Sequence, residues 1–277
     1  MKIFELLLLA LSLYYFLIFR PKAIKEKKRR QEVEKKSNPQ AQPASPVPPA
    51  APIIEKMVAC DFCRVRLPHS DAHEFDGRFY CGPAHLKLLN KEGFLGSCKQ
   101  VLSNNYDQRP ENTVVDTIVI HHISLPEGKF GGHAIEDFFC NRLNPKDDPY
   151  YPTIIDLQVS AHFLIKRDGE VVQFVSTLQR AWHAGASTLM GRERCNDFSI
   201  GVELEGTGEV PFEQKQYQVL QQLIQAIQVQ HPISAIVGHS DISPGRKQDP
   251  GKYFDWQYFQ KISQIPEQKF PFGLTAR

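Results

Sequence analysis

The sequence carries almost no net charge, because 33 Lys and Arg residues stand against 31 Asp and Glu residues and leave +2 at pH 7. This balance argues against a protein that binds nucleic acid over a broad basic surface. Most of the excess positive charge lies in one short run, residues 20–36 (RPKAIKEKKRRQEVEKK). Charge gathered in this way indicates a local surface contact. The hydrophobic fraction of 42% is ordinary for a globular protein, so the chain can build a full core.

A small-residue cleavage site is missing where a secretory signal peptide would need one. Residues 3–19 (IFELLLLALSLYYFLIF) are apolar apart from Glu5 and Ser12, but Arg20 and the basic run follow at once. The stretch is close to the minimum of about 17 residues for a membrane span. A buried core helix is the alternative, and the basic flank argues against it. Because Lys and Arg collect on the cytoplasmic side, we expect an inner-membrane anchor with the body of the protein facing the cytoplasm.

Apolar periodicity is absent from residues 37–56 (SNPQAQPASPVPPAAPIIEK), which are rich in Pro, Ala and Ser. Such a composition cannot bury a core and is typical of a semi-extended spacer. The sequence therefore predicts four parts: a transmembrane anchor over 1–20, a basic and Pro/Ala-rich linker over 21–56, a small zinc-binding module over 57–92, and a larger α/β domain over 101–277.

The small module carries two closely spaced pairs of metal-ligand residues, Cys60-x-x-Cys63 and Cys81-x-x-x-His85. Two pairs at these spacings are typical of a closed, tetrahedral structural zinc site, as in a zinc ribbon. Zinc would also explain how roughly 30 residues fold, because so small a core is marginal alone.

Other interpretations of this module remain open at this point. The cysteines could be unrelated thiols, although disulfides are disfavoured if the body is cytoplasmic. His69 and His73 could compete with His85 as the fourth ligand, but neither is paired with a nearby cysteine. The intervening segment RVRLPHSDAHEFDGRFY lacks a concentrated basic face, so the module is structural or binds an unidentified protein partner and does not bind nucleic acid.

The remainder predicts a mixed central β-sheet flanked by helices. A continuous β-branched run is typical of a central strand buried on both faces. An Asp-Gly pair between two apolar runs indicates a hairpin, and apolar residues at helical spacing indicate an amphipathic helix. The expected elements are a strand within 114–123, a hairpin over 159–175, a strand over 198–206, a helix over 213–231 and a short strand over 235–237.

Residues 238–251 (GHSDISPGRKQDPG) have the Gly and Pro density of a loop and are not expected to form a buried element. A hydrolytic zinc site needs three protein ligands and an open position for water. His239 and Asp249 are ten residues apart, a gap over which a loop can fold back. The third ligand would be His121 or His122, at the end of the first central strand. Adjacent strand residues point to opposite faces, so one of the two reaches the metal easily, and periodicity does not choose between them.

Six segments resemble, in order, the zinc N-acetylmuramoyl-L-alanine amidases of the AmpD type: SNNYDQRP, IVIHHISLPEGKFGG, VSAHFLIKRDGEVVQFV, RAWHAGAS, GRERCNDFSIGVELEGT and GHSDISPGRKQDPGKYFDW. The resemblance runs from about Ser103 to Trp256. The wider family includes phage amidases and animal peptidoglycan-recognition proteins, and the fifth segment is similar to the bacterial cytoplasmic branch. The resemblance implies an amidase/peptidoglycan-recognition-protein-like α/β fold.

The resemblance also implies a division of labour among the polar residues. It makes His121, His239 and Asp249 the ligands of a catalytic zinc ion. It implies that Glu203 helps to activate the attacking water and carries its proton. Lys247 would stabilise the oxyanion that forms when the amide carbonyl is attacked. The roles are chemically consistent, because a metal ion and a fixed cation together stabilise developing negative charge.

Several neighbouring residues are candidates for substrate contacts. His122 occupies a position that the family usually fills with Asn, next to the ligand and facing the substrate. Trp182 would wall the pocket, and Arg194 would hold a peptide carboxylate. Glu205 could take the role of Glu203, because alternating strand residues share a face.

Other histidines and one glutamine complete the site residues. His162 and His183 are expected to be hydrogen-bonded pocket or core histidines and not ligands. Gln158 stands where close relatives often carry Arg, so recognition of the peptide can differ there. The anchor and the cysteine segment lie outside the resemblance and are similar to small membrane-anchored bacterial proteins of obscure role.

The implied activity is zinc-dependent hydrolysis of the amide bond between N-acetylmuramic acid and L-alanine. A cytoplasmic location favours soluble 1,6-anhydro-muropeptides from peptidoglycan recycling as substrates. A non-catalytic peptidoglycan-fragment recognition protein is the alternative, and it would be expected to lack a zinc ligand. If the topology were reversed, the protein would be a periplasmic cell-wall amidase.

The basic run after the apolar stretch generates a prediction about topology. We expect protease added to intact spheroplasts to leave the C-terminal body undigested, and the same protease to digest it after permeabilisation. Immunoblotting of the C-terminus measures both. Digestion in intact spheroplasts would contradict the cytoplasmic orientation.

Overall fold

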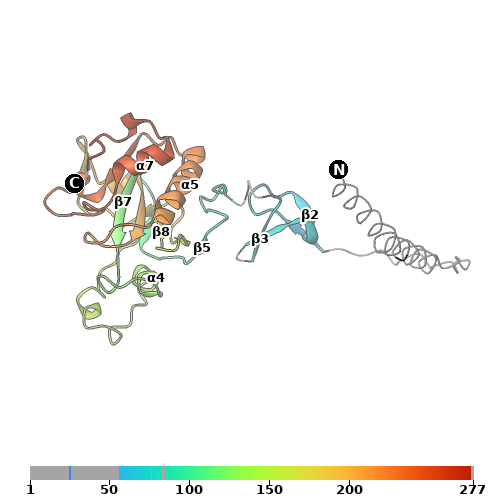
Figure 1. Ribbon diagram of the computed structural model, residues 1–277, viewed down its shortest axis with the longest axis horizontal. Coiled ribbons are helices and arrows are strands. Elements are labelled where there is room, and N and C mark those ends of the chain that lie inside the picture. The colour runs from blue at the N-terminus through green and yellow to red at the C-terminus, as the bar shows by residue number, and fades with distance from the viewer. Residues whose placement is uncertain (1–24, 26–55, 76, 83–84, 86, 276–277) are drawn as a thin grey trace, which may run out of the picture. The chain divides into compact units, whose positions relative to one another are not determined.

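The computed structural model describes residue 25 and residues 56–75, 77–82, 85 and 87–275 (Figure 1). The predicted membrane anchor and almost all of the predicted linker lie outside these residues. Among the residues described, no helix combines the length and the apolar character needed to cross a membrane. Apart from Lys25, the described residues belong to one unit that spans 55–277.

A six-stranded mixed sheet forms the centre of this unit, in the order β14-β7-β13-β8-β9-β5. The first four strands are parallel, β9 runs antiparallel to β8, and β5 runs parallel to β9. This confirms the expected mixed sheet. The bounds are β5 Lys99–Gln100, β7 Thr117–Ile123, β8 Phe163–Ile165, β9 Val171–Gln173, β13 Ser199–Glu205 and β14 Ala235–Gly238.

The central strand β7 is buried over most of its length, as its β-branched sequence predicts. It pairs in parallel with β13 over seven consecutive residues, from Thr117 opposite Ser199 to Ile123 opposite Glu205. Its other edge pairs with β14. The register places the carboxyl ends of three parallel strands at one edge of the sheet, where α/β proteins collect functional residues.

The expected hairpin forms, with shorter strands than the sequence suggested. Strands β8 and β9 are joined by a turn in which Lys166 N donates to Glu170 O and Gly169 N donates to Lys166 O, both at 2.9 Å. Gly169 has φ +90°, which a residue with a side chain adopts with difficulty. The Asp-Gly signal therefore located the turn correctly.

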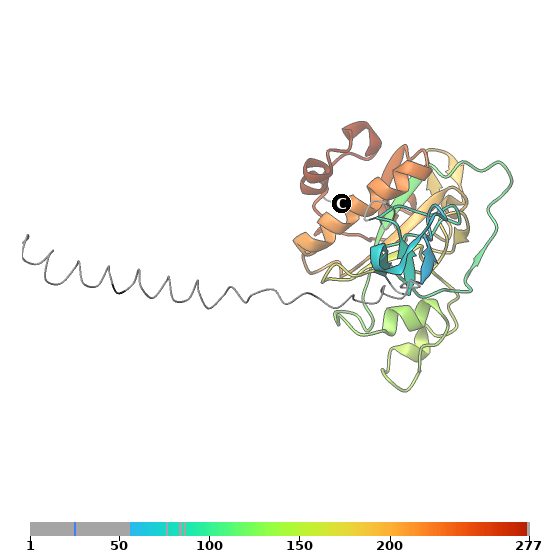
Figure 2. The ribbon, with the colours of Figure 1, turned by 90° about the vertical axis from the view of Figure 1, so that its right-hand side faces the viewer.

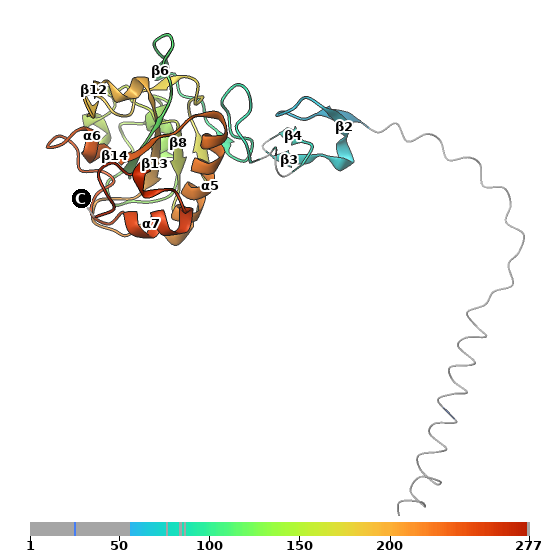
Figure 3. The same ribbon diagram turned by 90° about the horizontal axis from the view of Figure 1, so that it is seen from above.

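Two helices cover one face of the sheet (Figures 2 and 3). Helix α5, Gln214–Gln230, matches the expected amphipathic helix and begins with a capping box between Glu213 and Gln216. Helix α7, Trp256–Ser263, packs beside it. The largest hydrophobic cluster lies between these helices and the sheet and includes Ile118 and Ile120 of β7.

Smaller clusters cover the opposite face. Helix α4, Ala134–Phe139, packs Phe138 and Phe139 in one cluster with Leu164 and Val172 of the hairpin. Another cluster joins the other face of β7 to the short helix α6, His239–Ile242. Two further pairs of short strands are β6 Tyr106–Asp107 with β10 Arg180–Ala181, and β11 Thr188–Leu189 with β12 Arg192–Glu193. Short 3-10 turns lie at Tyr151–Thr153, Cys195–Asp197 and Glu267–Lys269.

The small module consists of two short hairpins. Its strands are β1 Met57–Ala59 with β2 Arg66–Pro68, and β3 His73–Phe75 with β4 Arg78–Tyr80. A 3-10 turn at His69–Asp71 joins them.

The segment that follows the module, residues 89–98, is called the connector and belongs to the core of the larger domain. Leu89, Leu95 and Cys98 are buried within the cluster under α5. Gln173 of β9 is fully buried and holds this connector, because its Oε1 accepts from Leu95 N and its Nε2 donates to Gly93 O, both at 2.8 Å. The core of the larger domain therefore includes residues that precede the boundary expected at 101.

Gln173 provides a stability test. Gln173→Leu keeps a similar volume but leaves Leu95 N without this partner, whereas Gly93 O still accepts from Thr177 N at 3.1 Å. We expect a loss of about 1–3 kcal/mol in the free energy of unfolding. Urea titration followed by circular dichroism measures the change. Gln218→Leu, on the exposed side of α5, is the matched control and should change stability by less than about 0.5 kcal/mol; equal stabilities for both variants would contradict the role of Gln173.

Candidate active site

Three side chains from separate segments converge at the carboxyl edge of the sheet. His121 lies near the end of β7, His239 begins α6 directly after β14, and Asp249 lies in the following loop. Nδ1 of His121 lies 3.0 Å from Nδ1 of His239 and 2.9 Å from Oδ2 of Asp249. The third edge of the triangle, from His239 Nδ1 to Asp249 Oδ2, is 3.1 Å.

The triangle fits a metal ion. Ligand atoms at about 2.0–2.2 Å from a tetrahedral zinc ion are about 3.3–3.6 Å apart, a few tenths of an ångström longer than the separations here. The three residues form a group whose ligand atoms could hold a metal. Adjacent residues of β7 point to opposite faces of the sheet, and His121 is the histidine that joins this group. Strand geometry predicted that one of His121 and His122 would do so. The set of one carboxylate and two imidazoles leaves a fourth position open, as in catalytic zinc sites.

The expectation that residues 238–251 form an unburied loop is wrong at its start. Residues His239–Ile242 make a short helix, α6, because β14 delivers the chain directly into a helical turn. His239 and Ile242 are buried, and Ile242 packs in the cluster beneath β7. The Gly- and Pro-rich remainder is irregular, and it brings Asp249 back to His239, with Ser240 N donating to Asp249 O at 2.8 Å.

Hydrogen bonds behind the site leave both Nδ1 atoms facing the triangle. His239 Nε2 donates to Ala184 O at 3.0 Å. His121 Nε2 lies 3.0 Å from His183 Nδ1, and His183 Nε2 lies 3.3 Å from Ser199 Oγ. If His183 Nε2 donates to Ser199 Oγ, His183 Nδ1 accepts from His121 Nε2. His121 then carries its proton on Nε2, which is the tautomer that leaves Nδ1 available to a metal ion. Burial, followed by the nearby His239, lowers the pKa of His121 to about 4, so the ring is neutral, as a ligand must be.

His183 can approach His121 because residue 201 is glycine. A Cβ on Gly201 would lie 2.4 Å from Cγ of His183, which is closer than side chains tolerate. His162 is also fully buried, and its Nδ1 accepts from Gly201 N at 3.0 Å. His183 is thus a hydrogen-bonded pocket residue and His162 a hydrogen-bonded core residue, the two environments expected for them. The supporting role of Gly201 was missed, because nothing in a strand pattern marks a glycine that admits a ring.

Glu203 lies directly opposite His121 in the β7–β13 register. Its side chain is buried at the cavity wall, and Oε2 has no hydrogen-bond partner among the described residues. Burial raises the pKa of Glu203 well above its ordinary value, the negative charge of Asp249 raises it further, and the positive charge of Lys247 opposes both effects. A buried carboxyl group without a partner, beside a triangle of metal ligands, holds its proton to a higher pH than an exposed carboxyl group and is a candidate for proton transfer.

Glu205 lies on the same face of β13 as Glu203, but its carboxylate makes hydrogen bonds that hold the structure together. Its Oε1 accepts from Gly131 N at 2.5 Å and its Oε2 accepts from Arg167 N at 3.1 Å. Because both oxygens are engaged by backbone amides, Glu205 holds two loops at the end of β13. The alternative that Glu205 replaces Glu203 therefore loses its support.

The metal-ligand triangle opens into a cavity of about 290 Å³. The cavity is lined by every residue expected to bind the catalytic zinc ion or to act in catalysis, together with two of the three expected substrate contacts. Its polar and aromatic lining includes His121, His122, Trp182, Glu203, His239, Lys247 and Asp249. Tyr150, Ile154 and Leu157 complete one wall and were not anticipated, because loop residues before β8 carry no periodic signal.

Two expected recognition residues lie elsewhere. The side chain of Arg194 is 67% exposed, pairs with Asp197 at 3.3 Å and does not line this cavity. Arg194 adopts φ +60°, a backbone conformation that a sequence pattern does not reveal. Gln158 lines an adjoining cavity of about 230 Å³ together with Trp182 and Lys247.

Comparisons with known proteins agree with this geometry. Residues 111–252 match the N-acetylmuramoyl-L-alanine amidase family, which is half of the chain. The chain belongs to this family. Within it, the chain is 49% identical over 172 residues to the 1,6-anhydro-N-acetylmuramyl-L-alanine amidase AmpD of Haemophilus influenzae, a match that covers 61% of this chain and 94% of that protein. The AmpD of Escherichia coli is 47% identical over 177 residues, with 63% of this chain and 97% of that protein covered.

A solved structure supports the same assignment at the level of the fold. The crystal structure of a selenomethionine derivative of AmpD is 47% identical and superposes with a TM-score of 0.61. The match covers 62% of this chain and 97% of that one. The cysteine module lies outside the family match, so the amidase fold accounts for the sheet and its metal-ligand triangle.

The hydrogen bond between His121 and His183 generates a prediction about metal affinity. His183→Ala removes the acceptor for His121 Nε2 and should weaken zinc binding about 10- to 100-fold, the usual effect of losing such a partner. Competition with a chromophoric chelator measures the dissociation constant, in a Cys60→Ser/Cys81→Ser background that leaves one ligand cluster intact. His231→Ala, which removes a buried histidine bonded to Thr177, should keep wild-type affinity. Equal affinities in both variants would contradict the role of His183.

Proposed function

We propose that the chain is a zinc-dependent amidase that hydrolyses the bond between N-acetylmuramic acid, in its 1,6-anhydro form, and the L-alanine of muropeptides. The observation that carries this proposal is the triangle of His121, His239 and Asp249 with the buried, unpartnered carboxyl of Glu203 in one cavity. Membership of the amidase family supports the bond, and identities of 47–49% to AmpD proteins support the anhydro-sugar substrate. The role in the cell would be peptidoglycan recycling.

His121, His239 and Asp249 would hold the zinc ion. When bound, zinc would polarise the amide carbonyl and increase the acidity of water in the cavity. The chain's contribution is to aim both imidazoles at one point, through the hydrogen bonds of their Nε2 atoms, and to keep His121 neutral by burial. The hydrophobic clusters under β7 and α6 then hold that geometry rigid.

Glu203 would act as general base and then as general acid. Its carboxylate would take a proton from the attacking water and deliver it to the nitrogen of L-alanine as the C–N bond breaks. Burial suits this exchange, because a raised pKa brings the carboxyl group closer to the pH at which it must both accept and donate. The free Oε2 has no competing hydrogen bond to break before it receives the proton.

Lys247 would stabilise the negative charge that forms on the carbonyl oxygen. It lines the cavity two residues before Asp249, so the loop that supplies a ligand also supplies a cation. A fixed ammonium group near the reacting carbonyl is worth most in the transition state, where the charge appears.

Substrate contacts would come from both sides of the reacting bond. His122 and Trp182 line the cavity and would contact the sugar or the first residues of the stem peptide. Gln158, in the adjoining cavity, would contact the peptide without the charge of an arginine. Arg194 would reach a peptide carboxylate beyond the cavity rim.

A non-catalytic recognition protein is the second candidate, and the site argues against it. Binding alone requires neither a complete ligand triangle nor a buried carboxyl group that lacks a partner. A chain with both has the parts of a hydrolase. The substrate's origin depends on topology, and a cytoplasm-facing domain would take recycled soluble muropeptides.

The separate roles of Lys247 and Glu203 can be tested by substitution. Lys247→Ala and Glu203→Ala should keep zinc and lose on the order of a hundredfold or more in single-turnover rate on anhydro-muramyl tripeptide. His239→Ala and Asp249→Ala should lose both zinc from this site and activity. Zinc content and single-turnover kinetics measure these effects.

Lys261→Ala, an exposed lysine of α7, is the matched control and should turn over at the wild-type rate. A wild-type rate for Lys247→Ala would mean that the loop only binds metal. Lack of turnover by the zinc-loaded wild-type protein would favour a recognition protein.

A further inference from the structure

The small module buries very few side chains. Among its described residues from 56 to 88, Val58, Cys60 and Tyr80 alone have buried hydrophobic side chains. Its four strands are three residues each and pair only as two separate hairpins. Domains below about 40 residues usually need a disulfide, a metal ion or a partner to fold. The module therefore lacks a core that could hold the two hairpins together.

The turn of the first hairpin has the geometry of a metal-binding knuckle. Cys60 N donates to Val65 O and Arg64 N donates to Cys60 O, both at 2.9 Å. Cys63 N lies 3.5 Å from Cys60 Sγ and donates to it. Arg64 has φ +64°, which closes the turn tightly. Amide donation to a sulfur and a tight turn place both cysteines of the pair on the same side.

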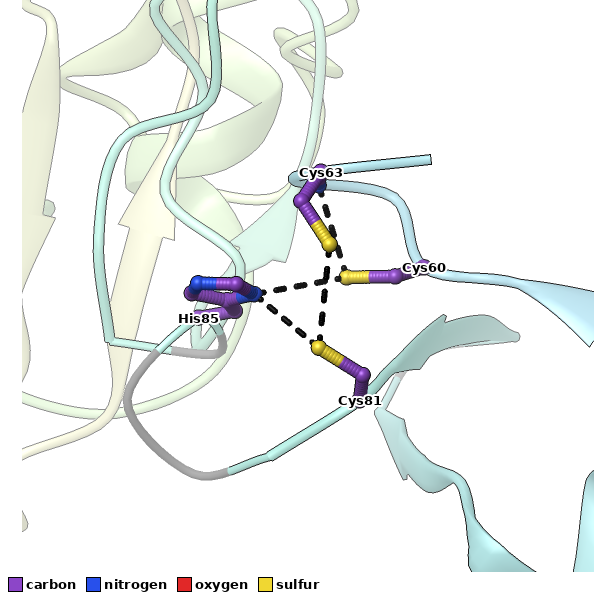
Figure 4. Close-up of side chains that lie close together, drawn as sticks. All are labelled: Cys60, Cys63, Cys81 and His85. Atoms are coloured by element: carbon purple, nitrogen blue, oxygen red, sulfur yellow. Dashed lines mark hydrogen bonds between the residues drawn. The ribbon is translucent and has the colours of Figure 1, made fainter. Parts of the chain in front are cut away.

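The second pair meets the first across the module (Figure 4). Cys63 Sγ lies 3.7 Å from Cys81 Sγ, and His85 Nδ1 lies 3.7 Å from Cys60 Sγ and 3.1 Å from Cys81 Sγ. All four ligand atoms lie within 4.8 Å of one another. In a tetrahedral zinc site with Zn–S bonds of about 2.3 Å, two sulfurs are about 3.8 Å apart.

A disulfide does not explain this cluster. The sulfur atoms of Cys63 and Cys81 are 3.7 Å apart, whereas a disulfide bond is about 2.05 Å long. All described cysteines are free. Four ligand groups that converge without a covalent bond between any two indicate a centre that binds all of them.

The geometry also selects the fourth ligand among the three histidines. His69 lies edge-on against Phe79, with ring centroids 5.0 Å apart, and its Nε2 is 4.0 Å from Glu74. His73 is exposed on β3 and belongs to no ligand cluster among the described residues. His85 is the histidine whose ring nitrogen reaches the cysteines.

We propose that Cys60, Cys63, Cys81 and His85 bind one Zn²⁺ as a closed structural centre on which the fold of the small module depends. Three thiolates and one imidazole in a tetrahedron are a ligand set that suits zinc. Four protein ligands leave no position for water, so this ion has no part in hydrolysis. The ion takes the place of the missing core, because it joins the knuckle of the first hairpin to the end of the second.

The contacts of the connector predict how far the effect of the ion extends. Asp61, inside the knuckle, accepts from Asn90 Nδ2 at 3.4 Å, and Arg78 of β4 donates to Cys98 O at 2.8 Å. These contacts tie the module to the connector. The connector is held independently by the larger domain, where Ser176 Oγ donates to Glu92 O at 2.6 Å in addition to the bonds of Gln173. Loss of the ion should therefore unfold the module, and this unfolding should not extend into the connector.

Metal content and proteolysis of the full chain test this proposal. The wild-type protein should contain two zinc ions per chain, Cys81→Ser one, and His239→Ala one. Trypsin should cleave Cys81→Ser after Arg64, Arg66 and Arg78 at least tenfold faster than the wild type, with the domain from the connector onward intact. Cobalt-loaded protein should show thiolate-to-cobalt charge-transfer absorption that is lost in Cys81→Ser and kept in His239→Ala.

Cys140→Ser, a half-buried cysteine outside the cluster, is the matched control and should keep two zinc ions and wild-type protease resistance. One zinc ion in the wild type, or unchanged proteolysis in Cys81→Ser, would overturn the proposal, and iron in place of zinc would overturn the choice of ion. The test of this zinc centre can succeed or fail independently of the test of hydrolysis. Two zinc ions in a protein that turns over no muropeptide would support this centre and contradict the amidase function, whereas one zinc ion in an active amidase would do the reverse.

Discussion

The parallel pairing of β7 with β13 and β14 is the constraint on which the site depends. It fixes Glu203 opposite His121 and ends β14 beside Ile120, so that the next residue, His239, starts α6 at the same edge. A shift of the register by one residue would turn His121 toward α5 and exchange it with His122. The buried branched side chains of β7 therefore do more than stabilise the sheet, because they determine which histidine joins the metal-ligand triangle.

Burial creates the chemistry of the site and also its structural demands. A dry environment keeps His121 neutral and raises the pKa of Glu203, both of which suit a metal-assisted hydrolase. The same environment requires a partner for every ring N–H, and the chain supplies His183 and a backbone carbonyl. Gly201 leaves room for the His183 ring, so one missing Cβ in β13 is linked to the orientation of a ligand in β7.

Sequence periodicity predicted the regular elements well, because their signals are local. The strands, the hairpin turn and α5 follow from side-chain alternation, an Asp-Gly pair and helical spacing. Residues whose position depends on tertiary structure were harder to place. Arg194 lies on an exposed turn, and the connector enters the core through contacts with Gln173, about 80 residues away in sequence. The metal ligands were assigned from the resemblance, whereas the choice between Glu203 and Glu205 required hydrogen bonds that no pattern contains.

The two ligand clusters follow different physical logic. The triangle at the sheet edge is built on a core that folds through apolar burial, so its ligands can be few and one position can stay open for chemistry. The cysteine cluster belongs to a module without such a core, so in the proposed zinc centre all four positions would hold the chain. An enzyme can tolerate an incomplete coordination sphere only where the surrounding protein already fixes the ligands. In the proposed two-zinc protein, the number of protein ligands at each cluster would thus match how much of the local fold apolar burial already supplies.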